Sequence, residues 1–120
     1  SLMGKAPDER GLQLARKCMS RVPSDAYVAA VQCLVEFEGR DHLPFITVPT
    51  LVLAGENDSN APVSMMEKMA QKIPGAEFAV ISGAGHLAPM GNPGAFNHAV
   101  LDFLARQANK NDTNQAVTMS

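Results

Sequence analysis

Two short apolar runs separated by a helical pattern constrain this fold more than any other feature of the sequence. Residues 50–54 form a continuous apolar run that enters Gly55, and residues 77–82 form a second run. Such runs are typical of strands that are covered on both faces in a parallel sheet. Between them, residues 63–73 carry apolar side chains on one helical face and stop at Pro74. Because strand, helix and strand make one right-handed crossover, we predict an α/β fold with two parallel strands.

Three further helices are predicted to flank this unit. Asp8 can cap a helix that runs to about residue 20. A second helix, capped by Ser24 or Asp25, ends near residue 39, and a last helix begins at Pro93. The side chains expected to face inward are Leu12, Ala15, Met19 and Val22 in the first helix, Tyr27, Val28, Val31, Leu34 and Val35 in the second, and Phe96, Val100, Phe103 and Leu104 in the last.

These patterns divide the chain into three parts. Residues 1–45 form a helical segment with a connector, and Phe45 and Ile46 are expected to anchor that connector on the core. Residues 46–107 form the unit of strands and helices. Beyond them the apolar periodicity stops and the composition turns polar, so residues 108–120 are predicted to be a disordered tail.

An acid and a histidine follow the two predicted strands. Asp58 lies four residues past the end of the first strand, and His86 lies four past the end of the second. Ligands of parallel sheets bind outside the carboxyl ends of the strands, where these two loops should meet. A carboxylate that bonds one imidazole nitrogen fixes the tautomer and leaves the other nitrogen free to transfer a proton. We therefore predict that Asp58 and His86 form a catalytic pair.

Each of these side chains sits in a longer motif. Residues 46–62 contain P-T-L-V-x-x-G-x-x-D-x-x-x-P, and residues 81–86 end in G-x-G-H. Together they resemble the acid loop and the histidine loop of the α/β-hydrolases, in that family's chain order of serine, acid and histidine. The resemblance covers about residues 46–105, the last two strands and helices of that fold. It implies that Asp58 is the acid of a catalytic triad and that His86 is its general base.

The family's nucleophile does not appear in this sequence. It sits upstream in a G-x-S-x-G turn, and no serine here has glycines at both required places. The first strands and the oxyanion-hole loop of the family are missing too, and Gly91 stands where many relatives have an acidic residue. The leading helices resemble the end of a cap region found in enol-lactone hydrolases, esterases and cofactor-free haloperoxidases. We therefore expect the chain to be the C-terminal part of a longer α/β-hydrolase.

The resemblance implies a serine-type hydrolase that acts on a small ester or lactone, with an enol-lactone as the first hypothesis. The chain alone is expected to be inactive, because it lacks the nucleophile and the oxyanion hole. The alternative hypothesis is a non-catalytic binding or interaction module derived from the same fold. For the two residues themselves, Asp58 could be only a turn residue and His86 only structural.

The glycine-rich segment at residues 83–88 also fits G-x-G-x-x-A after a strand, a pattern found in dinucleotide-binding proteins. Pro89 and Pro93 interrupt the helix that such a motif should open, and Asp102 lies within a helical pattern rather than at a strand end. We therefore expect no dinucleotide and no other cofactor.

Composition excludes several classes of function. Ten Lys and Arg against twelve Asp and Glu give a net charge of -2, without the basic stripe that nucleic acid requires. The apolar runs are shorter than the roughly 18 residues that a membrane span needs, and no secretion signal is visible, so we expect a cytoplasmic protein. Cys18 and Cys33 fall inside helical patterns and are predicted to be buried free thiols, and the histidine spacing suggests no metal site.

A sheet of only two strands leaves unpaired edges and an uncovered face. We therefore expect the chain to self-associate, either by pairing of strand edges or by exchange of the leading helices between copies.

Overall fold

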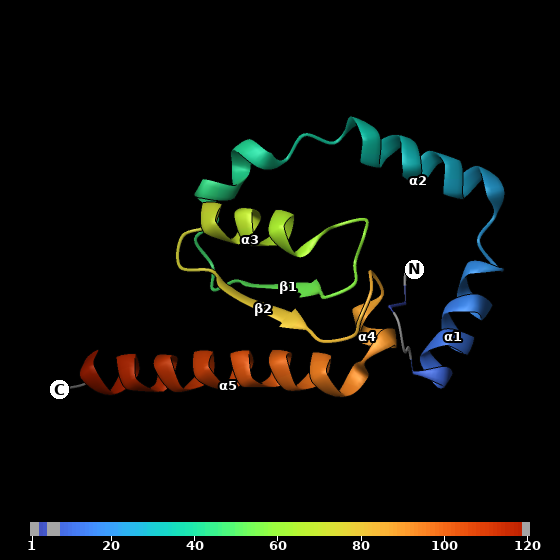
Figure 1. The fold of residues 1–120 in the computed structure, drawn as a ribbon. Coiled ribbons are helices and arrows are strands. Elements are labelled where there is room, and N and C mark those ends of the chain that lie inside the picture. Colours follow the sequence, from blue (N-terminus) through green and yellow to red (C-terminus); the bar gives the residue numbers. More distant parts are fainter. Residues whose placement is uncertain (1–2, 5–7, 119–120) are drawn as a thin grey trace.

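The computed structural model describes residues 3–4 and 8–118. Its elements in chain order are α1 (Glu9–Met19), α2 (Ser24–Glu36), the 3-10 helix η1 (Arg40–Phe45), β1 (Leu51–Gly55), α3 (Val63–Lys72), β2 (Glu77–Ile81), the short α4 (Ala88–Gly91) and α5 (Pro93–Thr118). Figure 1 shows the two strands side by side, with α3 and α5 on opposite sides of them. The α/β class and the crossover are as predicted.

The sheet is a parallel pair in which Leu51 lies opposite Glu77 and Gly55 lies opposite Ile81. Both strands therefore end at the same edge, and the loops that follow them leave from neighbouring positions. This confirms the predicted alignment of the strand ends, on which the site depends.

Each face of the sheet has its own apolar cluster. On the α3 side, Val52, Ala70 and Ile73 are buried, and Met66 and Phe78 pack against them. On the α5 side, Ile81, Ala84 and Ala88 are buried, and the partly buried side chains that pack against them are Leu53, Ala95, Phe96 and Ala99. Because side chains alternate along a strand, Val52 and Leu53 reach opposite faces. A strand that contributes to both faces explains why its sequence is apolar throughout.

The leading helices form largely where the sequence predicts them, but they are not buried as predicted. Asp8 caps α1 as expected, accepting a hydrogen bond of 2.8 Å from the Gly11 amide. The predicted cap of α2 is wrong, because Pro23 precedes that helix and no side-chain hydrogen bond caps it. Of the four residues expected to face inward from α1, only Ala15 is buried.

Helix α2 buries none of its residues, so its predicted inward side is exposed. Leu34 is 77% exposed and Val35 is 79% exposed. The periodicity gave the correct secondary structure, but no element in the described part of the chain covers this side of the helix. The predicted anchor Phe45 is also exposed, whereas Ile46 does pack against the α3 cluster.

Two further predictions about burial are wrong. Cys18 and Cys33 lie on exposed surface of α1 and α2, so they are free thiols but not buried ones. Each cysteine lies on a part of its helix that no element of the described residues covers. Leu104, expected to face inward from the last helix, is also exposed, while Phe103 is partly buried.

Helix α5 continues to Thr118, well past the predicted end near residue 107. The predicted disordered tail is therefore wrong for residues 108–118, and residues 119–120 lie outside the described residues. No glycine or proline follows Gly94, so nothing in the sequence ends the helix, although its apolar pattern does end. An ion pair between Arg106 on α5 and Glu77 at the start of β2 ties the helix to the sheet and raises the pKa of that guanidinium.

Candidate active site

The loop after β1 holds the Asp58 carboxylate in a fixed orientation. The Asp58 amide donates to the Gly55 carbonyl at 3.1 Å, which closes a tight turn directly after the strand. Asp58 Oδ1 then accepts hydrogen bonds from the backbone amides of Asn60 (2.8 Å) and Ala61 (3.0 Å). An aspartate that bonds amides two and three residues ahead stabilises its own turn. The other carboxylate oxygen, Oδ2, is thereby directed away from the turn.

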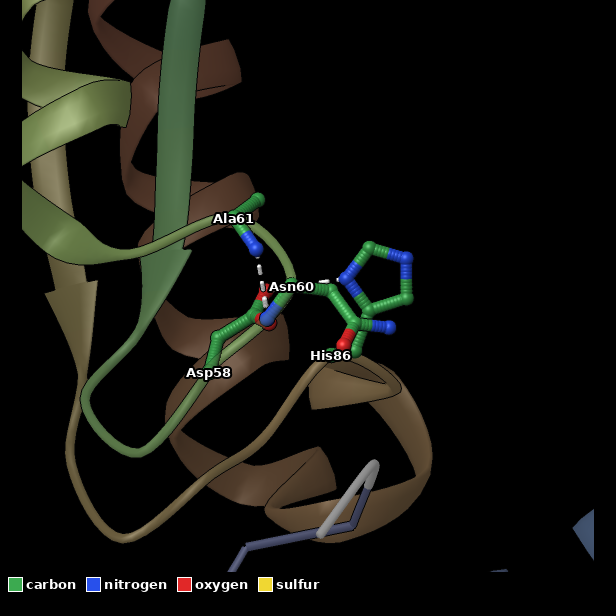
Figure 2. Close-up of polar contacts among 4 residues, drawn as sticks. All are labelled: Asp58, Asn60, Ala61 and His86. Atoms are coloured by element: carbon green, nitrogen blue, oxygen red, sulfur yellow. Dashed lines mark hydrogen bonds and ion pairs between the residues drawn. The ribbon is translucent and has the colours of Figure 1, made fainter. Parts of the chain in front are cut away.

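The loop after β2 brings His86 to that second oxygen. His86 Nδ1 lies 2.9 Å from Asp58 Oδ2, as the dashed line in Figure 2 shows. An ionised carboxylate can only accept, so the proton of this hydrogen bond belongs to Nδ1 and Nε2 is left as the free acceptor. The structure thus brings together the two side chains that the sequence predicted as a pair.

Backbone contacts hold the two loops in register beyond the last rung of the sheet. The Glu56 amide donates to the Ile81 carbonyl at 3.0 Å, and the Asn57 amide donates to the Ala84 carbonyl at 2.8 Å. Gly55 permits this close approach, because a Cβ built on it would lie 2.2 Å from the Gly85 carbonyl oxygen. The loops are therefore packed backbone against backbone, which leaves the pair little room to separate.

The two members of the pair differ in exposure. The Asp58 side chain is 7% exposed, while that of His86 is 46% exposed. A buried carboxylate next to an accessible imidazole suits a division of roles, in which the acid orients the base and the base meets a reactant. In Figure 2 the imidazole projects from its loop beyond the acid turn.

The pKa of Asp58 lies below its ordinary value of 3.8. Desolvation by burial is the largest single influence and acts to raise the pKa. The hydrogen bond from the Ala61 amide, the bond to His86, the bond from the Asn60 amide and the attraction of the His86 charge act the other way and together outweigh it. Asp58 is therefore ionised at neutral pH, as an acceptor for the Nδ1 proton must be.

Two side chains at this edge make contacts with the histidine loop that were not predicted from the sequence, although Asn92 was expected to cap the last helix. The Glu56 carboxylate accepts hydrogen bonds from the Gly83 amide (2.7 Å) and from Ser82 Oγ (3.2 Å) at the start of the histidine loop. Asn92 donates to the Ser82 carbonyl at 3.0 Å and accepts from the Ala95 amide at the start of α5. The available signal was an acidic residue directly after one strand, facing a serine and a glycine directly after its neighbour.

The remaining sequence candidates lie away from this site. His98 is exposed on α5, 3.6 Å from Asp102, and His42 is exposed on η1. Within residues 3–4 and 8–111, no three side chains of the metal-binding types gather into a cluster. No described helix has the length and apolar character needed to cross a membrane.

The dinucleotide alternative is not supported. The glycine-rich segment at residues 83–88 leads into α4, a helix of four residues, instead of opening a long helix. Asp102 lies in the interior of α5 and not at a strand end. A hollow of about 520 Å³ beside α4 is lined by Asp8, Ser82, Gly83, Gly91, Asn92, Pro93 and Gly94. Neither Asp58 nor His86 lines that hollow.

Comparison with known proteins places this arrangement in context. The chain is 32% identical over 85 residues to the RutD protein of Stutzerimonas stutzeri, which is provisionally described as a carbamate hydrolase; the match covers 71% of this chain and 32% of that protein. It is 30% identical over 79 residues to a pimeloyl-(acyl-carrier protein) methyl ester esterase of Vibrio vulnificus, covering 66% of this chain and 31% of the esterase.

Among solved structures, the enol-lactonase from Burkholderia xenovorans LB400 superposes with a TM-score of 0.74 at 28% identity, over 78% of this chain and 36% of the lactonase. The chain thus spans about a third of the length of the relatives it matches. A family model described as alpha/beta hydrolase fold matches residues 14–93, which include both strands and both loops of the site. On this evidence, the chain belongs to the alpha/beta hydrolase fold family.

Proposed function

We propose that Asp58 and His86 are the acid and the general base of a serine-type hydrolase that acts on a small ester or lactone. The observation that carries this proposal is the 2.9 Å hydrogen bond between His86 Nδ1 and Asp58 Oδ2, with Oδ1 held by two backbone amides. This arrangement fixes the imidazole tautomer that carries its proton on Nδ1 and leaves Nε2 free to accept a proton. In this proposal, the serine and the oxyanion hole belong to a part of the hydrolase outside these 120 residues.

In the proposed reaction, His86 Nε2 takes the proton of the serine hydroxyl as its oxygen attacks the carbonyl carbon of the substrate. Asp58 stabilises the imidazolium that forms and keeps its ring in place. The imidazolium then gives the proton to the departing alkoxide oxygen, and an acyl-enzyme remains. Water then enters, and His86 takes one of its protons as the water oxygen bonds to the acyl carbon. The bond from that carbon to the serine oxygen breaks, the imidazolium returns the proton to the serine, and the acid product is released.

The substrate class rests on the relatives and on the accessibility of the base. Two of the similar proteins are described as a methyl ester esterase and an enol-lactonase, so both candidate bonds are acyl–oxygen bonds. An enol-lactone is our first candidate, because the lactonase superposes over 78% of this chain. The His86 side chain is half-exposed, as a base that meets a substrate must be.

A chimera tests the proposal. Residues 46–107 of this chain replace the matching segment of the Burkholderia lactonase, which supplies the rest of the fold. We expect Asp58→Asn to lower kcat of the chimera by about 10⁴-fold and His86→Ala to lower it by about 10⁶-fold, because triad members act as a unit. The matched control is His98→Ala, which removes the histidine of the exposed pair with Asp102. Unchanged ester and lactone turnover in His86→Ala would contradict the assignment.

The 120-residue chain gives a second test that needs no partner segment. We expect it to show no serine-type turnover by itself, since it lacks the groups that lower the barrier most. Its proton NMR spectrum should nevertheless show a downfield His86 Nδ1–H resonance that disappears in Asp58→Asn. Hydrolysis by the chain alone, blocked by a serine-directed inhibitor, would overturn the first expectation, and absence of the resonance would overturn the second.

A further inference from the structure

The start of the histidine loop is held by a side chain of the acid loop. Glu56 follows β1 directly and lies two residues before Asp58. Its Oε2 accepts from the Gly83 amide at 2.7 Å and from Ser82 Oγ at 3.2 Å. Both partners belong to the opposite loop, so the carboxylate connects the segment that carries Asp58 to the segment that carries His86.

The Gly83 amide lies at the point where the histidine loop turns away from the sheet. Gly83 has a φ of +68°, in the left-handed region that glycine adopts without strain. The amide of this glycine donates to the Glu56 carboxylate. Hydrogen bonds to an ionised acceptor are shorter and stronger than neutral ones, in agreement with the 2.7 Å separation. Glu56 therefore stabilises the turn from which His86 is displayed.

Contacts from Glu56 and Asn57 hold every residue from Ile81 to Ala84. The Glu56 amide bonds the Ile81 carbonyl, its carboxylate bonds residues 82 and 83, and the Asn57 amide bonds the Ala84 carbonyl. His86 follows only two residues later. On the far side, Asn92 bonds the Ser82 carbonyl from the start of α5.

We propose that Glu56 is a positioning residue, whose carboxylate sets the separation of Asp58 and His86 by fixing the start of the histidine loop. Without it, the turn at Ser82 and Gly83 would lose two hydrogen bonds to the acid loop. An imidazole at the end of a looser loop would no longer stay within 2.9 Å of Asp58 Oδ2. The importance of Glu56 for catalysis rests on the proposed function. The effect of Glu56 on the separation of Asp58 and His86 does not.

The test uses the 120-residue chain and two NMR measurements. The first is the downfield His86 Nδ1–H resonance, and the second is hydrogen exchange of the Gly83 amide. In Glu56→Ala, we expect the resonance to broaden or vanish and Gly83 exchange to accelerate about tenfold or more, as loss of a hydrogen bond to a charged group implies. Amides of β1 and β2 should keep their exchange rates. Glu67→Ala, which removes an exposed carboxylate from α3, is the matched control and should change neither signal.

Two conservative variants separate positioning from general destabilisation. Glu56→Gln keeps an acceptor oxygen at the same distance from the backbone. Its His86 resonance should therefore resemble that of the wild type, while Gly83 exchange should stay a few-fold faster than in the wild type. Glu56→Asp keeps the charge but shortens the reach by one methylene, and it should behave like the alanine variant. If Glu56→Ala does not fold, Glu56→Asp decides the question.

An unchanged His86 resonance and unchanged Gly83 exchange in folded Glu56→Ala or Glu56→Asp would overturn the proposal. These readouts are independent of the chimera's turnover. If His86→Ala leaves the chimera active while the Glu56 variants shift the resonance, the proposed function fails and the positioning role stands. If His86→Ala abolishes activity while the Glu56 variants change nothing, the positioning role fails alone.

Discussion

The unit of two strands and the leading helices differ in how their apolar side chains are covered. In the strand unit, each face of the sheet has a buried cluster, and Ile81 is only 2% exposed. In α2, the apolar side chains have the same helical spacing that the sequence predicts, yet none is buried. The two regions lie in one chain and have similar hydrophobicity, so composition does not explain the difference. The strand unit contains the partners of its own apolar surface, and α2 does not.

This difference explains where the candidate site lies. Both loops of the site leave from the strand unit, and the bonds between them involve only residues 55–58 and 81–86. Positioning of the acid and the base thus depends on the well-packed region. Helix α2 buries no residue and takes no part in these bonds, whereas α1 packs closely against α4, which follows the histidine loop.

The largest effect on stability is expected from a cavity in the strand unit. Ile81→Ala removes most of a fully buried side chain, so we expect the free energy of unfolding to fall by about 2–5 kcal/mol. Val35→Ala on the exposed side of α2 is the matched truncation, and it should change the free energy of unfolding by less than about 0.5 kcal/mol. Urea denaturation followed by circular dichroism measures both. Equal losses would show that α2 is covered in solution, and the contrast between the two regions would disappear.

The exposed side of α2 also bears on self-association. We propose that copies of the chain associate through exchange of the leading helices or through pairing of strand edges. If the helices exchange, Val35→Glu should raise the dissociation constant roughly tenfold or more, because burying one valine contributes about 1.5–3 kcal/mol. Sedimentation velocity over a range of concentrations measures this. Unchanged association in Val35→Glu leaves edge pairing, and a monomer at every concentration contradicts both routes.

The smallest effect concerns the pH dependence that Asp58 gives to the strand unit. Its folded-state pKa is depressed, so its contribution to stability is present above the unfolded value near 3.8 and is lost as pH falls through the lower, folded value. We expect the difference in unfolding free energy between the wild type and Asp58→Asn to narrow as pH falls from 5 towards 3. Asp41→Asn, at an exposed acid on η1, is the control. A difference that widens over this range would mean that the Asp58 pKa is raised.

The features predicted correctly depend on short-range patterns. The order of strand, helix and strand fixes a parallel pair, and a parallel pair places Asp58 and His86 at one edge without further information. The sequence also indicates the Asp8 cap, because the capping interaction spans only three residues. The catalytic roles of Asp58 and His86 come only from the resemblance to the family, because geometry alone does not assign them, and they stay a prediction.

The features that were missed depend on contacts between distant residues. The exposure of α2, Cys18 and Cys33 could not be predicted. A periodic apolar side indicates which face of a helix is apolar, but not whether another element covers that face. The bonds from Glu56 to the histidine loop join residues 26 and 27 positions apart, and no local pattern marks them. The continuation of α5 was missed because the prediction relied on apolar spacing, whereas only the absence of a breaker is needed to extend a helix.

The hydrogen bond between Asp58 and His86 joins residues that are only 28 positions apart in the chain. The entropy of closing a loop grows with the logarithm of its length, so each doubling costs about 0.6 kcal/mol more. An acid and a base on adjacent strands of one crossover therefore meet through one short closure, which is the same closure that pairs the strands. Once β1 and β2 have paired, no further ordering of the chain over long distances is needed for the carboxylate to reach the imidazole.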